Sequence, residues 1–142
     1  LMGPKQVWNS DLACVGLLWA KRQANTRGQL KDFMDLCFER FFKRQFAVNS
    51  LDAVSGLLEE AGLSIDGFAE YAASDGMAEH LELQERLLDK GCFGVPTFLV
   101  DDEVYFGREH LARVCWHLGG AKGDPPLKVY PWLGQGGSWE TA

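Results

Sequence analysis

The chain has 142 residues, of which 46% are hydrophobic, 12% aromatic and 24% charged, a composition typical of one globular domain with its own core. The formal charge of −6 repels phosphate polymers and anionic lipid surfaces, and no apolar run approaches the roughly 20 residues that span a bilayer. We therefore expect a cytoplasmic protein with no nucleic acid partner and no membrane partner.

The first two-thirds of the chain is predicted to be helical. Helix-capping residues and apolar spacings of three and four residues predict five helices. The first follows Asn9 and Ser10 and runs to about residue 25, the second spans 30–46, the third follows Ser50 and ends at 61, the fourth begins at 64 and ends before a break at 74–76, and the fifth spans 77–90.

Two sets of residues on these helices have a structural and a functional interpretation. Phe38, Phe41 and Phe42 form an aromatic stripe whose default role is core or dimer packing, the alternative being a hydrophobic substrate pocket. His80, and His117 further along the chain, have no partner at metal-ligand spacing, so we expect surface or packing residues.

Four cysteines, Cys14, Cys37, Cys92 and Cys115, are scattered along the chain. None belongs to a C-x-x-C pair or to a cysteine–histidine spacing typical of zinc sites. The expectation is therefore buried structural thiols, no metal, and no dithiol redox centre within this chain.

The pattern changes after residue 91. The β-branched and aromatic runs 97–100 and 104–106 flank the acidic segment 101–103 and predict a β-hairpin. A last helix is predicted from 108 to Gly119, followed by a loosely ordered Pro- and Gly-rich tail over 121–142. Because an isolated hairpin is marginal in water, we expect its edge to pair with a second copy, giving a homodimer, or with a preceding segment of a longer chain.

One motif resembles a known family. The segment Gly94–Thr97, its spacing to Phe106–Gly107, and residues 108–111 resemble the C-terminal part of a DsbA-like thioredoxin fold, most closely 2-hydroxychromene-2-carboxylate isomerases and kappa-class glutathione transferases. The resemblance extends from Trp8 to about Gly120. It implies an α/β thioredoxin-like fold with a large helical insertion, so that this chain is mostly α with a C-terminal hairpin and helix.

The resemblance also implies a division of the chain. Residues 1–8 would be an N-terminal remnant, 9–91 the helical insertion, 92–120 the C-terminal part of the thioredoxin-like domain, and 121–142 the tail. The whole protein is then expected to be longer than this chain.

The same resemblance implies a glutathione site at Val95, Pro96, Arg108 and Glu109. The backbone before a cis proline would bind the cysteine of glutathione in strand-like fashion. Glu109 would hold the γ-glutamyl ammonium, and the free N–H groups beside it, at the start of the last helix where Arg108 also lies, would take the γ-glutamyl carboxylate. The alternative interpretation, which requires no ligand, is that Pro96 is a trans proline that starts a strand and that Glu109 is a carboxylate stabilised by the helix dipole. The sequence around Val95 and Pro96 favours the cis form. The family's Asp is Glu109 here, and its Arg is His110.

No catalytic residue is expected in this chain, because the family's nucleophile-stabilising serine, or the C-x-x-C of its oxidoreductase branch, would precede Trp8. Three functions remain open. The first is part of a glutathione-dependent isomerase or transferase that acts on a small hydrophobic or aromatic substrate. The second is a DsbA-like or FrnE-like thiol–disulfide oxidoreductase, and the third is a non-catalytic helical interaction module.

Overall fold

The computed structural model describes residues 6–126, so most of the predicted tail and the first five residues lie outside the described part. The chain forms two compact units that divide after Gln84, inside helix α5. The sequence division at residue 91 lies a little further along the chain. Each unit has its own core, and the two are described separately.

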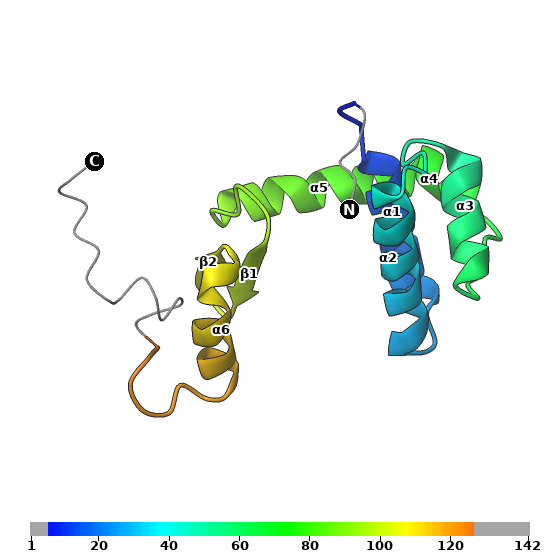
Figure 1. Ribbon diagram of the computed structural model, residues 1–142. Helices are drawn as coiled ribbons and strands as arrows, with labels where there is room; N and C mark the ends of the chain where they lie inside the picture. The colour runs from blue at the N-terminus through cyan, green and yellow to red at the C-terminus, as the bar shows by residue number, and fades with distance from the viewer. Residues whose placement is uncertain (1–5, 127–142) are drawn as a thin grey trace, which may run out of the picture. The chain divides into compact units, whose positions relative to one another are not determined.

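The first unit is entirely helical (Figure 1). It consists of α1 (Asp11–Gln23), α2 (Arg27–Phe42), α3 (Leu51–Glu60), α4 (Phe68–Ala73) and the first part of α5 (Asp75–Asp89). The Thr26 side chain accepts a hydrogen bond from the Gln29 N–H at the start of α2, and Ser50 accepts one from Ala53 at the start of α3. The helical prediction for this part of the chain is confirmed.

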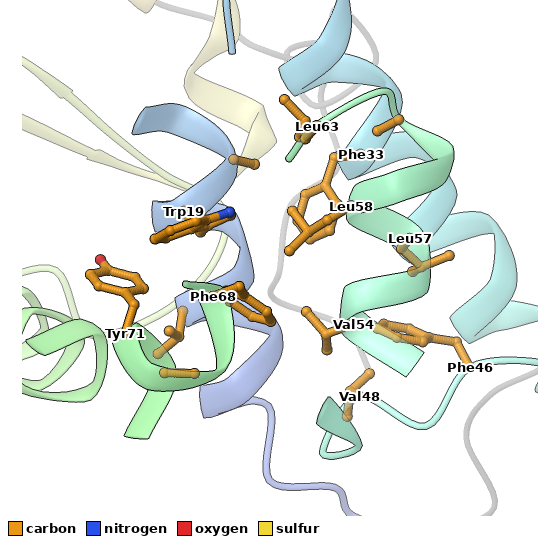
Figure 2. Close-up of a cluster of buried hydrophobic side chains, with 14 residues drawn as sticks. Trp19, Phe33, Phe46, Val48, Val54, Leu57, Leu58, Leu63, Phe68 and Tyr71 are labelled. Carbon is orange, nitrogen blue, oxygen red and sulfur yellow. The ribbon is translucent and has the colours of Figure 1, made fainter. Parts of the chain in front are cut away.

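A continuous apolar cluster holds these helices together (Figure 2). Trp19 of α1 lies between two aromatic rings of α4, with ring centroids 5.8 Å from Phe68 and 5.2 Å from Tyr71. Its indole N–H donates to the Ser64 carbonyl at 2.7 Å, so the polar end of the ring is satisfied. The most deeply buried side chains are Val15, Phe33, Val54, Leu58 and Phe68.

Several helix boundaries were predicted wrongly: α2 begins at Arg27 instead of residue 30, and the predicted last helix begins at Leu111 instead of 108, because a 3₁₀ turn precedes it. α2 ends at Phe42, because Arg44 adopts a positive φ of 60° and the chain turns back to bury Phe46 in the core. α4 begins at Phe68 instead of residue 64, since Ser64 accepts a hydrogen bond from the Asp66 N–H and Gly67 has a φ of 84°, a conformation that ends helical geometry.

A further difference lies between α4 and α5. The predicted break over 74–76 is confined to Ser74, whose φ of −135° and ψ of −100° are not helical. α5 then starts at Asp75, and Gly76 lies so close to Tyr71 that a Cβ there would be 2.6 Å from the Tyr71 ring.

The second unit contains the predicted hairpin and final helix. Strand β1 (Thr97–Val100) pairs antiparallel with β2 (Glu103–Phe106), so that Phe98 faces Tyr105 in register. Glu103 belongs to β2 and not to the turn. A single 3₁₀ turn, η1 (Arg108–His110), leads into α6 (Leu111–Leu118). Val100, Tyr105 and Val114 form the small core between hairpin and helix.

The two histidines singled out from the sequence are packing residues. His80 is buried, with Nε2 3.2 Å from Asp11 Oδ1 and 3.0 Å from Gln84 Nε2. His117 Nδ1 lies 2.9 Å from the Tyr105 hydroxyl.

Within residues 6–126, no three His, Cys, Asp or Glu side chains are grouped closely enough to hold a metal ion, and no helix is long and apolar enough to cross a bilayer.

The cysteines differ in part from the expected buried thiols. Within the described chain they are unpaired; Cys14, Cys37 and Cys92 are half-buried and Cys115 is exposed. The prediction is wrong for Cys115, because α6 turns only one narrow face, centred on Val114, toward the small core of the second unit.

Candidate functional site

The start of β1 is fixed to the residue that follows β2. The Gly107 N–H donates to the Pro96 carbonyl at 2.8 Å, which extends the hairpin ladder by one bond beyond the Thr97–Phe106 pair. The Thr97 hydroxyl donates to the Gly94 carbonyl. The peptide bond between Val95 and Pro96 is cis. These contacts hold the backbone on both sides of Val95.

Val95 itself is open to solvent. Its side chain is 91% exposed, and neither its N–H nor its carbonyl takes part in a hydrogen bond with any residue between 6 and 126. The neighbouring Phe93 and Phe106 rings pack with centroids 4.7 Å apart. A side chain at Gly94 would lie 2.8 Å from the Phe106 ring, so a glycine is needed there. Val95 therefore presents a free peptide donor and acceptor beside a fixed aromatic pair.

The Glu109 carboxylate lies over the same backbone. It occupies the position where a Cβ of Gly107 would project, and Gly107 has a φ of 95° that L side chains rarely adopt. Among the described residues, no hydrogen bond or ion pair satisfies this carboxylate, and none engages the exposed Arg108 guanidinium. A short series of contacts, from Pro96 through Gly107 to Glu109, thus places the carboxylate close to the open strand start.

The structure therefore brings together three of the four residues that the sequence singled out. Val95, Pro96 and Glu109 belong to one surface, and Arg108 precedes Glu109 on the same turn. A free peptide edge can pair with an extended ligand backbone. An unpaired carboxylate can hold an ammonium group through charge-assisted hydrogen bonds, each worth about 1.5–3 kcal/mol. These groups are suited to binding and orienting a ligand, and the described residues of the arrangement include no paired thiols.

A second feature is an apolar cavity of about 620 Å³ in the first unit, on the aromatic stripe for which the sequence left a hydrophobic pocket open as the alternative to packing. Phe38 and Phe41 of the aromatic stripe line it, whereas Phe42 does not. Cys14 and Cys37 also line it, and burial raises the pKa of both thiols, that of Cys37 to about 12. The sequence did not predict that the two cysteines would line this cavity; its only signal for them was that each lies on the apolar face of its helix.

Comparison with known proteins agrees with this architecture. The model of the DSBA-like thioredoxin domain matches residues 2–118. A similar curated protein is a 2-hydroxychromene-2-carboxylate isomerase of Sphingobium xenophagum, 24% identical over 103 residues, which are 72% of this chain and 53% of the relative. The chain thus spans about half the length of that relative. No solved structure matches the chain. The match over most of the sequence, together with the hairpin, final helix and helical unit, shows that this chain belongs to the DSBA-like thioredoxin domain family.

Proposed function

We propose that this chain carries the glutathione-binding half of a glutathione-dependent isomerase or transferase. The observation that supports this most is the pairing of two unsatisfied groups on one small surface. The free peptide edge of Val95 and the unpaired carboxylate of Glu109 are joined through the Pro96–Gly107 hydrogen bond.

These groups match the chemistry of glutathione. The cysteinyl residue of glutathione has a peptide N–H and carbonyl that can pair with the Val95 backbone as a short added strand. The γ-glutamyl residue carries an ammonium group, which suits the Glu109 carboxylate, and one free α-carboxylate, which suits the Arg108 guanidinium. Each of the three residues thus has a separate role in holding one part of the ligand.

The proposed reaction is the isomerisation or conjugation of a small hydrophobic or aromatic electrophile. Bound glutathione supplies a thiol that can add to an alkene conjugated with a carbonyl; rotation about the resulting single bond and reversal of the addition give the isomer. The residues of this chain contribute by holding the thiol at a fixed place relative to the substrate. The name of the Sphingobium xenophagum relative, an isomerase of an aromatic carboxylate, supports this class of reaction.

Titration of the 142-residue chain with glutathione tests the proposal. We expect chemical-shift changes at the amides of Val95 and Glu109 below about 10 mM ligand. Glu109→Gln should weaken binding by about tenfold, the value of one charge-assisted contact. The matched control is Glu103→Gln, which removes an exposed carboxylate of β2 in the same unit and should leave the affinity unchanged.

The capped dipeptide N-acetyl-Cys-Gly distinguishes the proposal from the oxidoreductase alternative. It offers the same cysteinyl peptide groups to Val95 but has no γ-glutamyl ammonium, so it should bind the native chain more weakly than glutathione does, and its affinity should be the same for the native chain and for Glu109→Gln. Equal binding of both ligands to the native chain would indicate a general peptide-binding edge, as in a thiol–disulfide oxidoreductase. Absence of any shift would refute glutathione binding by this chain.

A further inference from the structure

The peptide group between Gly94 and Val95 is held by a single side chain. Its carbonyl accepts a hydrogen bond from the Thr97 hydroxyl, and no backbone N–H between residues 6 and 126 donates to the same oxygen. Packing restricts the Gly94 end as well, since a Cβ there would lie 2.8 Å from the Phe106 ring. Within the described residues, the Thr97 hydroxyl thus makes the only hydrogen bond of this peptide group.

A planar trans peptide fixes the direction of its N–H once its carbonyl is fixed. The bond between Gly94 and Val95 is trans, and the carbonyl and N–H of a trans peptide point in opposite directions. Because the carbonyl points to the Thr97 hydroxyl, the Val95 N–H points away from Thr97. The 91% exposure of Val95, and the lack of a partner for its N–H among the described residues, agree with this direction.

The backbone of Thr97 does not take over this task. The Gly107 N–H donates to the Pro96 carbonyl, so Pro96 and Gly107 form a hydrogen-bonded pair of the ladder. Such pairs alternate in an antiparallel ladder, and Thr97 and Phe106 are therefore a non-hydrogen-bonded pair. Since a glycine backbone has a wide range of allowed conformations, a side-chain restraint on Gly94 has a large effect on the peptide that follows it.

We propose that Thr97 is a positioning residue of the glutathione site. Its hydroxyl holds the Gly94 carbonyl and thereby points the Val95 N–H at the cysteinyl carbonyl of the ligand. This inference rests on the proposed function, which supplies the ligand. Thr97 acts through Val95, so loss of the hydroxyl should widen the range of orientations of the Val95 N–H and lower the affinity without removing a ligand contact.

Thr97→Val and Thr97→Ser separate the hydroxyl from the rest of the side chain. Valine keeps the shape and the strand propensity but has no donor, whereas serine keeps the donor. We expect Thr97→Val to weaken glutathione binding by about fivefold, the value of one neutral hydrogen bond, and Thr97→Ser to stay within about twofold of the native chain. Equal losses in the two variants, or no loss in Thr97→Val, would overturn the proposal.

A comparison of two ligands shows through which group Thr97 acts. Glutathione and N-acetyl-Cys-Gly share the cysteinyl peptide groups that pair with Val95, so Thr97→Val should weaken the binding of both by the same factor. Glu109→Gln should weaken glutathione alone, and in the double variant the two factors should multiply. A loss confined to glutathione would mean that Thr97 acts through Glu109 and would contradict the proposal.

Val104→Ala is the matched control for a general loss of stability. Val104 lies on β2 opposite Leu99, and alanine at this position lowers the stability of the strand while leaving the bond between Thr97 and Gly94 in place. Under conditions in which denaturant unfolding shows both variants folded, Val104→Ala should bind glutathione like the native chain. A loss as large as that of Thr97→Val would show that affinity follows stability, and the proposal would fail.

A measurement without ligand separates this inference from the proposed function. The NMR order parameter of the Val95 N–H should fall in Thr97→Val and return to the native value in Thr97→Ser, with the Val100 N–H of β1 as an unchanged reference. If none of the chains binds glutathione, the proposed function is refuted, and the order parameter still decides whether Thr97 orients this peptide. An unchanged Val95 value in Thr97→Val would overturn the inference even where glutathione binds.

Discussion

Gly107 is the residue on which the proposed glutathione site depends most directly. It donates the hydrogen bond to Pro96 and leaves the space that the Glu109 carboxylate occupies. A methyl group at this position would have to displace the carboxylate, the flexible end of a side chain, and would also suffer the cost of a positive φ of 95°. Stability and ligand binding are therefore both sensitive to this position.

Gly107→Ala should lower the free energy of unfolding by about 1–2 kcal/mol, the cost of a left-handed conformation for an L side chain. It should also weaken glutathione binding, because Glu109 moves. Gly91→Ala is the matched control, since Gly91 has a φ of 82° and nothing within 4 Å of the added methyl group. Denaturant unfolding and glutathione titration of both variants should show similar losses of stability but a loss of affinity only in Gly107→Ala. Unchanged affinity in Gly107→Ala would remove Glu109 from the site.

Individual site residues were partly predictable from the sequence. The motif around Val95, Pro96 and Glu109 could be recognised because its residues are close together in the chain. Cys14 and Cys37 could not be assigned to one cavity, because helical periodicity gives the face of each residue but not which faces meet. The contact of His80 with Asp11 was hidden for the same reason.

At the scale of elements, Gly16 determines how closely α1 approaches its neighbours. A methyl group at this position would lie 2.6 Å from Val54 Cγ1 of α3 and 3.2 Å from Phe33 Cζ of α2. Val54 and Phe33 are almost completely buried, so neither side chain can move without disturbing the core. Helices α1, α2 and α3 thus meet at one glycine in the middle of α1.

Gly16→Ala should therefore lower the free energy of unfolding by about 1–3 kcal/mol, the usual cost of overpacking a core, despite the better helix propensity of alanine. Gly56→Ala on α3 is the control, because nothing lies within 4 Å of its added methyl group. It should raise stability by about 0.5–1 kcal/mol. Chemical denaturation of both variants measures the difference, and stabilisation by Gly16→Ala would contradict the close packing of α1 against α3.

The existence and order of the helices and strands followed from the sequence more reliably than their ends did. Periodicity and capping predicted the six α-helices, and β-branched and aromatic runs predicted the two strands labelled in Figure 1. The ends differed where a tertiary contact or a backbone turn decided the outcome: Phe46 leaves the helix in order to be buried, and Gly67 delays the start of α4. Local propensity cannot register either effect, since burial depends on residues distant in the chain.

At the scale of the whole molecule, the two units have cores of very different size. The core of the first unit contains fourteen buried apolar side chains, from Val15 to Ala72, whereas that of the second contains Val100, Tyr105 and Val114, with Phe98 packed against them. Since burial of apolar surface is the main stabilising contribution to folding, the second unit should open at a lower free energy than the first. The proposed glutathione site then lies on the less stable unit and the apolar cavity on the more stable one.

Hydrogen exchange of the native chain tests this difference at single residues. Amides of Val100 and Tyr105 should exchange through an opening of lower free energy than those of Val15 and Leu58, which lie in the first core. Glutathione at about ten times its Kd should raise the free energy of opening of the second unit by about 1.4 kcal/mol and leave that of the first unit unchanged. If glutathione raises the free energy of opening of both units equally, the chain opens as one cooperative body, and the division inside α5 does not separate two units of different stability.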